Sequence, residues 1–175
     1  MTAASQITTS PALEVLERTP GILRGLLAAA TREEMDWRPS PERWSITMVL
    51  AHLADVEEKG FRQRFRAMAE EEFPFLPSYD QLALFRLGAQ FNPVEELEKF
   101  ERERHGTLEW LRSLPAGVGQ RSGRHEELGT ITVAQLLNEF AFHDLGHIRQ
   151  VAELYRSRVF YPRMGPYQNY YKINQ

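Results

Sequence analysis

The sequence of 175 residues contains no cysteine, which excludes disulfide bridges, thiolate metal sites and a cysteine nucleophile. It also has no excess of positive charge, because 21 Lys and Arg face 24 Asp and Glu, for a net charge of −3. Proteins that bind nucleic acid usually carry a clearly basic face. The basic residues here are dispersed along the chain, so we expect no nucleic-acid partner. A chain without cysteine suits a reducing compartment.

Long apolar runs are also absent. No uninterrupted stretch approaches the about 20 residues that a membrane-spanning helix needs. The opening residues, MTAASQITTS, lack the positive and apolar regions of a secretory signal. We therefore expect a cytoplasmic protein with no membrane partner. The sequence has no internal repeat and no linker-like boundary, and its length is ordinary for one domain, so residues 1–175 are interpreted as a single domain.

What the chain does contain is helical periodicity. Apolar residues recur every three to four positions, and capping residues open several of the segments. A break or kink is expected at Pro20-Gly21, inside the first segment. The predicted long helices cover residues 10–30, 45–72, 92–115 and 132–158, with a short helix at 80–91. The sequence thus predicts an all-α four-helix bundle with a short additional helix and an extended, aromatic C-terminal tail.

Histidines are the candidate functional residues. His143 and His147 lie four residues apart in the stretch NEFAFHDLGHIRQ, so both stand on one face of a helix. His52 lies on another predicted helix, between Val49 and Val56 on the apolar face. Three imidazoles that meet in a bundle form an open site for a divalent metal ion: Zn²⁺, Ni²⁺ or Fe²⁺. Unliganded histidines are the alternative. The spacing HDLGH is not the HExxH of a metalloprotease, because Asp144 stands where the glutamate would be.

Two blocks of sequence, WSITMVLAHLADVE and GTITVAQLLNEFAFHDLGHIRQ, resemble the DinB-like superfamily of four-helix-bundle proteins. The resemblance extends from the first predicted helix to about residue 156. This superfamily places one metal-binding histidine in an HLxxxE context and two in an HxxxH pair. The resemblance therefore implies that His52, His143 and His147 are metal ligands. It also implies a homodimer, and a metal-dependent enzyme related to low-molecular-weight thiol S-transferases.

Two acidic residues are candidates for supporting roles. Asp55 follows His52 by three residues and Glu139 precedes His143 by four, so either carboxylate could orient an imidazole. Glu139 is also the candidate catalytic base, and a surface salt bridge is the alternative for Asp55. We expect a metal-dependent transferase or hydrolase that acts on a small molecule, with a low-molecular-weight thiol as a candidate partner. The alternative is a non-catalytic, metal-binding, dimer-forming stress-response protein.

Overall fold

The computed structural model describes residues 7–86 and 90–171. It confirms the all-α class. Three of the long helical segments are single helices, and the fourth, residues 46–70, passes through a π-helical turn, η3. The segments are α1 (Pro11–Leu27), α3 (Ile46–Val56) with η3 (Glu57–Arg62) and α4 (Gln63–Glu70), α6 (Pro93–Ser113), and α7 (Val133–Tyr155). None of the described helices combines the length and apolarity needed to cross a membrane.

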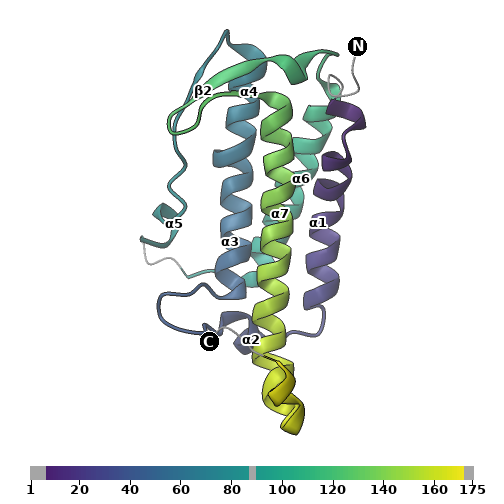
Figure 1. Ribbon diagram of the computed structural model, residues 1–175, viewed down its shortest axis with the longest axis vertical. Coiled ribbons are helices and arrows are strands. Elements are labelled where there is room, and N and C mark those ends of the chain that lie inside the picture. Colours follow the sequence, from purple (N-terminus) through teal and green to yellow (C-terminus); the bar gives the residue numbers. More distant parts are fainter. Residues whose placement is uncertain (1–6, 87–89, 172–175) are drawn as a thin grey trace.

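The four helical segments form a bundle. The first two long helices in chain order, α1 and α3, lie diagonally across it from each other. Both α1 and α3 pack against α6 and also against α7. Figure 1 shows α1 and α7 running in one direction and α3 and α6 in the other. As a result α3 and α7, which carry the candidate histidines, are antiparallel neighbours. Side chains from the two helices can therefore meet in the space between them.

Side-chain caps begin each of these segments where the sequence predicts them. Ser10, Ser45 and Asn92 each accept a hydrogen bond from a backbone N–H in the first turn of α1, α3 and α6. Thr132 and Gln135 form a reciprocal capping box at the start of α7. Such caps satisfy backbone donors that have no partner inside the helix.

Of the break or kink expected at Pro20-Gly21, the break does not occur, because α1 continues through both residues. Proline has no N–H, so the carbonyl of Leu16, four residues earlier, loses its usual helical partner at this point. That carbonyl instead accepts a hydrogen bond of 2.8 Å from Nη1 of Arg104 on α6. The helix thus tolerates an internal proline because the buried guanidinium of Arg104 replaces the missing N–H donor.

Short elements close the two ends of the bundle. A hairpin of β2 (Ser122–His125) and β3 (Gly129–Thr132) leads into α7, and β1 (Phe75–Leu76) pairs parallel to β2. A one-turn helix, α2 (Arg32–Asp36), precedes α3. Within the predicted helix at 80–91 the structure has α5 (Ala83–Arg86), while residues 87–89 lie outside the described part. Two short 3₁₀ turns, η2 (Ile7–Thr9) and η4 (Val118–Gln120), lie before α1 and before β2.

As far as Tyr171, where the described part ends, the C-terminal tail is not extended, contrary to expectation. After α7 the chain forms a π-helical turn and two 3₁₀ turns, namely η5 (Arg156–Phe160), η6 (Tyr161–Arg163) and η7 (Gly165–Tyr170). Pro162 and Pro166 lie in the first turn of η6 and η7, where a fixed φ favours helical backbone. In Figure 1 these turns project beyond the end of α7.

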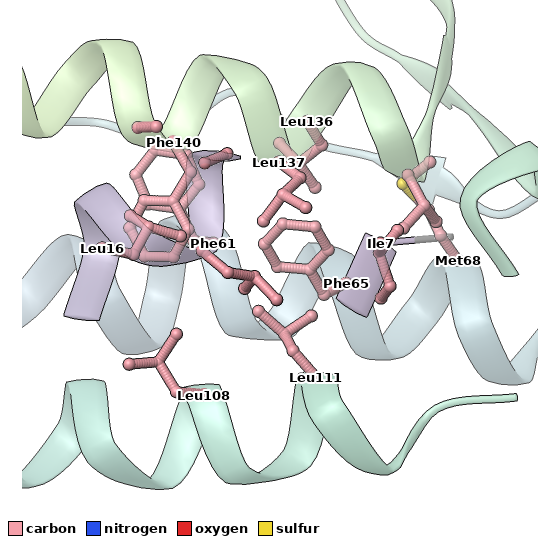
Figure 2. Close-up of a cluster of buried hydrophobic side chains, with 14 of the residues drawn as sticks. Ile7, Leu16, Phe61, Phe65, Met68, Leu108, Leu111, Leu136, Leu137 and Phe140 are labelled. Atoms are coloured by element: carbon pink, nitrogen blue, oxygen red, sulfur yellow. The ribbon is translucent and has the colours of Figure 1, made fainter. Parts of the chain in front are cut away.

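Two apolar clusters make up the interior of the described residues. One cluster, shown in Figure 2, packs Phe61 and Phe65 against Phe140, near the end of the bundle where α7 begins. The other cluster surrounds Leu50 and Phe100 toward the opposite end. On α6 and α7, buried polar residues lie in sequence between residues of one cluster and residues of the other. This polar layer contains the candidate site.

Candidate metal centre

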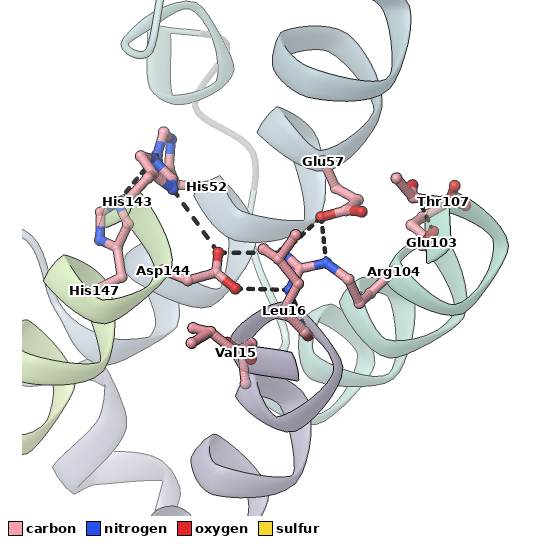
Figure 3. A network of polar contacts seen from close by, with 11 residues as sticks. Val15, Leu16, His52, Glu57, Glu103, Arg104, Thr107, His143, Asp144 and His147 are labelled. Carbon is pink, nitrogen blue, oxygen red and sulfur yellow. Dashed lines mark hydrogen bonds and ion pairs between the residues drawn. The ribbon is translucent and has the colours of Figure 1, made fainter. Parts of the chain in front are cut away.

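The three candidate histidines converge between α3 and α7. His52 comes from α3, and His143 and His147 lie one turn apart on α7 (Figure 3). Nε2 of His143 lies 3.2 Å from Nε2 of His52 and 3.2 Å from Nε2 of His147. One ligand atom from each of the three rings lies within 4.8 Å of the others, the arrangement needed for a metal ion. Tertiary structure thus brings together residues separated by about ninety positions in the sequence.

The spacing of the ring nitrogens fits a shared cation. Nitrogens bound at about 2.0–2.1 Å stand about 3.4 Å apart around a tetrahedral ion and about 3.0 Å apart around an octahedral one. The observed 3.2 Å lies between these values. Hydrogen bonding explains the cluster less well, because Nε2 of His143 faces two other Nε2 atoms. A neutral imidazole has a single N–H to donate.

The environment keeps the imidazoles of His52 and His147 neutral, as metal ligation requires. Burial, with the neighbouring histidines, lowers the pKa of His52 from 6.5 to about 3. Burial, with His143, lowers the pKa of His147 from 6.5 to about 4, although a hydrogen bond to Gln150 opposes the shift. At neutral pH both rings therefore have a lone pair available for a cation.

Gln150 orients the ring of His147. Its Oε1 lies 2.9 Å from Nδ1 of His147. Because an amide oxygen only accepts hydrogen bonds, Nδ1 carries the proton and Nε2 is left with its lone pair toward the other two histidines. Gln150 stands three residues after His147, a spacing that places the two side chains on one face of the helix. Metal-bound histidines generally use such a partner to hold their tautomer.

A buried ionic network adjoins His143. Arg104 donates to both carboxylate oxygens of Asp144, at 2.6 and 3.1 Å, and to Oε2 of Glu57, at 3.0 Å (Figure 3). All three side chains are almost completely buried. Oδ1 of Asp144 lies 4.0 Å from Nδ1 of His143. The network therefore fixes a negative charge beside the central histidine.

Arg104 supplies the positive charge that faces the two buried carboxylates of this polar layer. Arg104 lies between the rings of Phe100 and Phe140, with its guanidinium carbon 4.7 and 4.5 Å from their centroids. Burial by itself raises the pKa of a carboxyl group. For Asp144 the ion pair with Arg104 outweighs this effect and lowers the pKa, whereas for Glu57 burial prevails and the pKa is raised. Asp144 is the carboxylate that Arg104 binds through both oxygens, whereas Glu57 is bound through one.

Aromatic rings line the rest of the site. The ring of Trp44 lies 5.0 Å from that of His52 and is stacked parallel to that of His147 at 6.4 Å. Phe61 packs edge-on to His143 at 5.3 Å, and Tyr79 lies 6.1 Å from His52. These rings pack around the histidine cluster, in which His52 is buried and the other two histidines are partly buried.

Comparison with known proteins places this architecture in a family. The sequence profile of the DinB superfamily matches residues 15–151, a stretch that includes all three histidines. The chain belongs to the DinB superfamily. The resemblance identified from the sequence is therefore confirmed.

Relatives of this DinB protein have names that refer to metal-dependent hydrolysis. It is similar to YfiT of Bacillus subtilis, named "putative metal-dependent hydrolase", with 28% identity over 82% of each chain. It is also similar to OB0782 of Oceanobacillus iheyensis, which has the same designation, with 24% identity over 79% of this chain and 81% of the relative. The solved structure of YfiT superposes with a TM-score of 0.73 at 25% identity, covering 83% of this chain and 85% of the other. It is described as "a probable metal-dependent hydrolase with an unusual four-helix bundle topology".

The two acidic residues considered from the sequence have different environments in the DinB fold. Asp55 does not contact His52 through a hydrogen bond in the described residues, and instead accepts bonds of 2.6 Å from Lys59 and 2.7 Å from the Tyr79 hydroxyl. Asp55 therefore holds the Tyr79 ring near the site. Glu139 lies one turn before His143. Although the Glu139 side chain is exposed, surrounding groups desolvate it enough to raise its pKa, against the opposing influence of His143 and Arg64.

Sequence reasoning missed Gln150 and Asp144. Gln150 carried a usable signal, because a polar side chain three residues after a candidate ligand shares its helix face. Asp144 carried none, since it is adjacent to His143 and points toward α6 rather than along the histidine face. Its role depends on Arg104, forty residues away in the sequence.

Proposed function

We propose that this DinB-superfamily protein is a divalent-metal-dependent hydrolase of small molecules, in which His52, His143 and His147 hold the ion. The observation that carries the proposal is that Nε2 of His143 lies 3.2 Å from Nε2 of both other histidines, with one ligand atom of each ring within 4.8 Å of the others. The names of the relatives support the reaction class. The donor set of three imidazoles is compatible with Zn²⁺, Ni²⁺ or Fe²⁺.

The composition of the ligand set favours catalysis over a structural metal. Structural zinc sites are normally closed by four protein ligands, whereas catalytic sites combine three protein ligands with an open position. Within residues 7–86 and 90–171, the candidate ligand group consists of three histidines without a carboxylate. A cleft that shares Trp44 and Gln150 with the surroundings of the histidines offers space for a substrate. These features are the ones that a non-catalytic metal-binding protein would not need.

The residues around the histidines have distinct proposed roles. When bound, a divalent ion supplies Lewis acidity, which polarises a substrate carbonyl and lowers the pKa of water. Gln150 keeps His147 in the tautomer that directs Nε2 into the site. Glu139 acts as the general base that takes a proton from the attacking water, and its raised pKa brings it closer to the range in which a carboxylate serves that role. Trp44 and Tyr79 exclude bulk water.

Transfer to a low-molecular-weight thiol is a variant of the same proposal. A site that ionises water can also ionise a thiol, so the three-histidine arrangement supports either nucleophile. The thiol partner and the homodimer stay predictions from the resemblance. Hydrolysis is the reaction that the names of the relatives favour.

The test is metal content together with turnover. We expect elemental analysis of the purified protein to find about one divalent ion per chain, and we expect His143→Ala to lose it, because Nε2 of His143 is the nitrogen that faces both other rings. His105→Ala is the matched control, since His105 is an exposed histidine on α6. Equal metal content in His143→Ala and the control contradicts the site.

Hydrolysis of a panel of activated carboxylic esters and amides is then measured for the metal-loaded protein, with and without an added thiol. Turnover that follows metal content across the variants supports the proposal. Stoichiometric metal with no turnover of any panel member, with or without thiol, supports the non-catalytic alternative instead.

A further inference from the structure

A cleft of about 940 Å³ lies between the loop before α3, the C-terminal half of α7, and the turns η6 and η7. In Figure 1 these elements gather at the end of the bundle where α7 ends. The volume falls in the range that accommodates a small organic ligand. The cleft includes Trp44 and Gln150 in its wall, and these residues also contact His52 and His147. The cleft thus shares two wall residues with the surroundings of the candidate metal centre.

The charges in the cleft wall are unbalanced. Arg156 is paired with Glu153, which accepts hydrogen bonds of 2.5 and 3.0 Å from it. Arg43 and Arg149 also line the cleft, and in the part of the chain that the structure describes their guanidinium groups form neither a hydrogen bond nor an ion pair. Two uncompensated positive charges therefore face this space, in a protein whose net charge is −3.

The uncharged part of the wall includes two indole rings. Trp37 and Trp44 both line the cleft and come from the same loop. Indole rings bind planar apolar groups by stacking. Guanidinium groups bind oxyanions through paired N–H donors. The two surfaces together match a molecule with an anionic group at one end and a flat apolar body.

We infer that this cleft binds a small organic anion, through an oxyanion group held by Arg43 and Arg149 and an apolar body packed on Trp37 and Trp44. The inference rests on the proposed function, because it assigns the substrate class of the same site. Bound in this way, the molecule lies beside Trp44 and Gln150, the two wall residues that contact His52 and His147. The arginines bind and orient the anion and take no part in bond breaking.

Calorimetric titration with three probes of similar shape tests the inference: 2-naphthoate, 2-naphthylphosphonate and the neutral 2-naphthamide. The metal-free protein is titrated first, so that a carboxylate or phosphonate cannot bind through a metal ion. We expect saturable binding of at least one anion, tighter than binding of the amide, and weakened by added salt. Comparing the two anions distinguishes a carboxylate-binding cleft from a phosphate-binding one.

Two variants and a control locate the anion. Loss of one charge-assisted hydrogen bond at a solvent-accessible position weakens binding by about threefold to tenfold. We expect this loss in Arg43→Gln and in Arg149→Gln, whose exposed side chains can be changed without disturbing the core. Arg102→Gln is the matched control, because Arg102 is an exposed arginine on α6, outside the cleft wall, and its removal changes the net charge equally. Melting temperatures verify that all three variants are folded.

The inference is overturned if the anions bind no better than the amide, if no probe binds saturably, or if Arg43→Gln and Arg149→Gln bind like Arg102→Gln. An anion preference found only in the metal-loaded protein also overturns it, since the anion then binds the metal. That last outcome leaves the proposed function intact. Conversely, anion binding in the cleft of a protein that shows no metal-dependent hydrolysis leaves the cleft intact and contradicts the proposed function.

Discussion

Replacing Arg104 by methionine tests the buried network on which the candidate site rests. Arg104 is the only cation in contact with the buried carboxylates of Glu57 and Asp144 among the described residues. Methionine fills a similar volume without charge. The change therefore leaves two carboxylates in the protein interior without their partner, while the surrounding apolar packing is largely kept.

The magnitude follows from these contacts. Removing one partner of a buried ion pair costs about 3–5 kcal/mol, because the other charge stays desolvated. Glu57 limits the cost, since its pKa is already raised by burial and it can become protonated. Asp144 loses the cation that lowers its pKa in the native protein, so burial then favours its protonated form as well, and the variant must either keep a desolvated carboxylate or take up a proton. For a domain of this size about 1 kcal/mol corresponds to 2–4 °C, so we expect the melting temperature of Arg104→Met to fall by about 6–20 °C.

A triple variant separates lost pairing from lost packing. With Glu57→Leu and Asp144→Leu added to Arg104→Met, no buried charge is left, and such replacements are often neutral or stabilising. Recovery stays incomplete by about 1–3 kcal/mol, because the Leu16 carbonyl loses its donor and Pro20 cannot replace it. Thermal and urea unfolding measure both effects. The reasoning is refuted if Arg104→Met melts within about 2 °C of the native protein, or if the triple variant is no more stable than the single one.

Three further results are expected. Gln150→Ala lowers zinc affinity by about 10- to 100-fold in a competition titration with a chelator, because His147 loses the acceptor that sets its tautomer; unchanged affinity shows that the hydrogen bond is dispensable. Glu139→Gln keeps the metal but lowers kcat by about 10²- to 10⁴-fold in the ester assay, and an unchanged kcat removes Glu139 as the base. For the metal-free protein, the free energy of unfolding decreases as pH falls from about 6.5 toward 4. This follows because unfolded histidines take up protons near pH 6.5, while His52 and His147 in the fold stay neutral until about 3 and about 4. Urea midpoints at pH 7 and 5 measure this decrease, and it should be smaller in His52→Gln; an equal decrease in both proteins refutes the assignment.

Local sequence determined the helices of this protein and their starting points. Ser10, Ser45, Asn92 and Thr132 cap the helices that the sequence predicts, because capping depends on residues within the same turn. The i, i+4 spacing of His143 and His147 likewise places both rings on one face without reference to the rest of the chain.

Other features were decided by contacts between helices. The sequence favoured a break or kink at Pro20-Gly21, but α1 continues without a break because Arg104, from α6, donates to the Leu16 carbonyl that the proline leaves free. Asp55 could have oriented His52 by spacing alone, but it binds Lys59 and Tyr79 instead, because the β1–α5 connection brings a phenol within reach.

The histidine site depends both on local sequence and on contacts between helices. The sequence determines which residues the site contains and on which helix faces they lie. It does not determine that Nε2 of His52 comes within 3.2 Å of Nε2 of His143. That approach requires α3 and α7 to be antiparallel neighbours, while α1 and α3 lie on the diagonal. Which helices become neighbours is a property of how all the apolar faces are buried together. Local periodicity determines a face for each helix but not the partner that covers it.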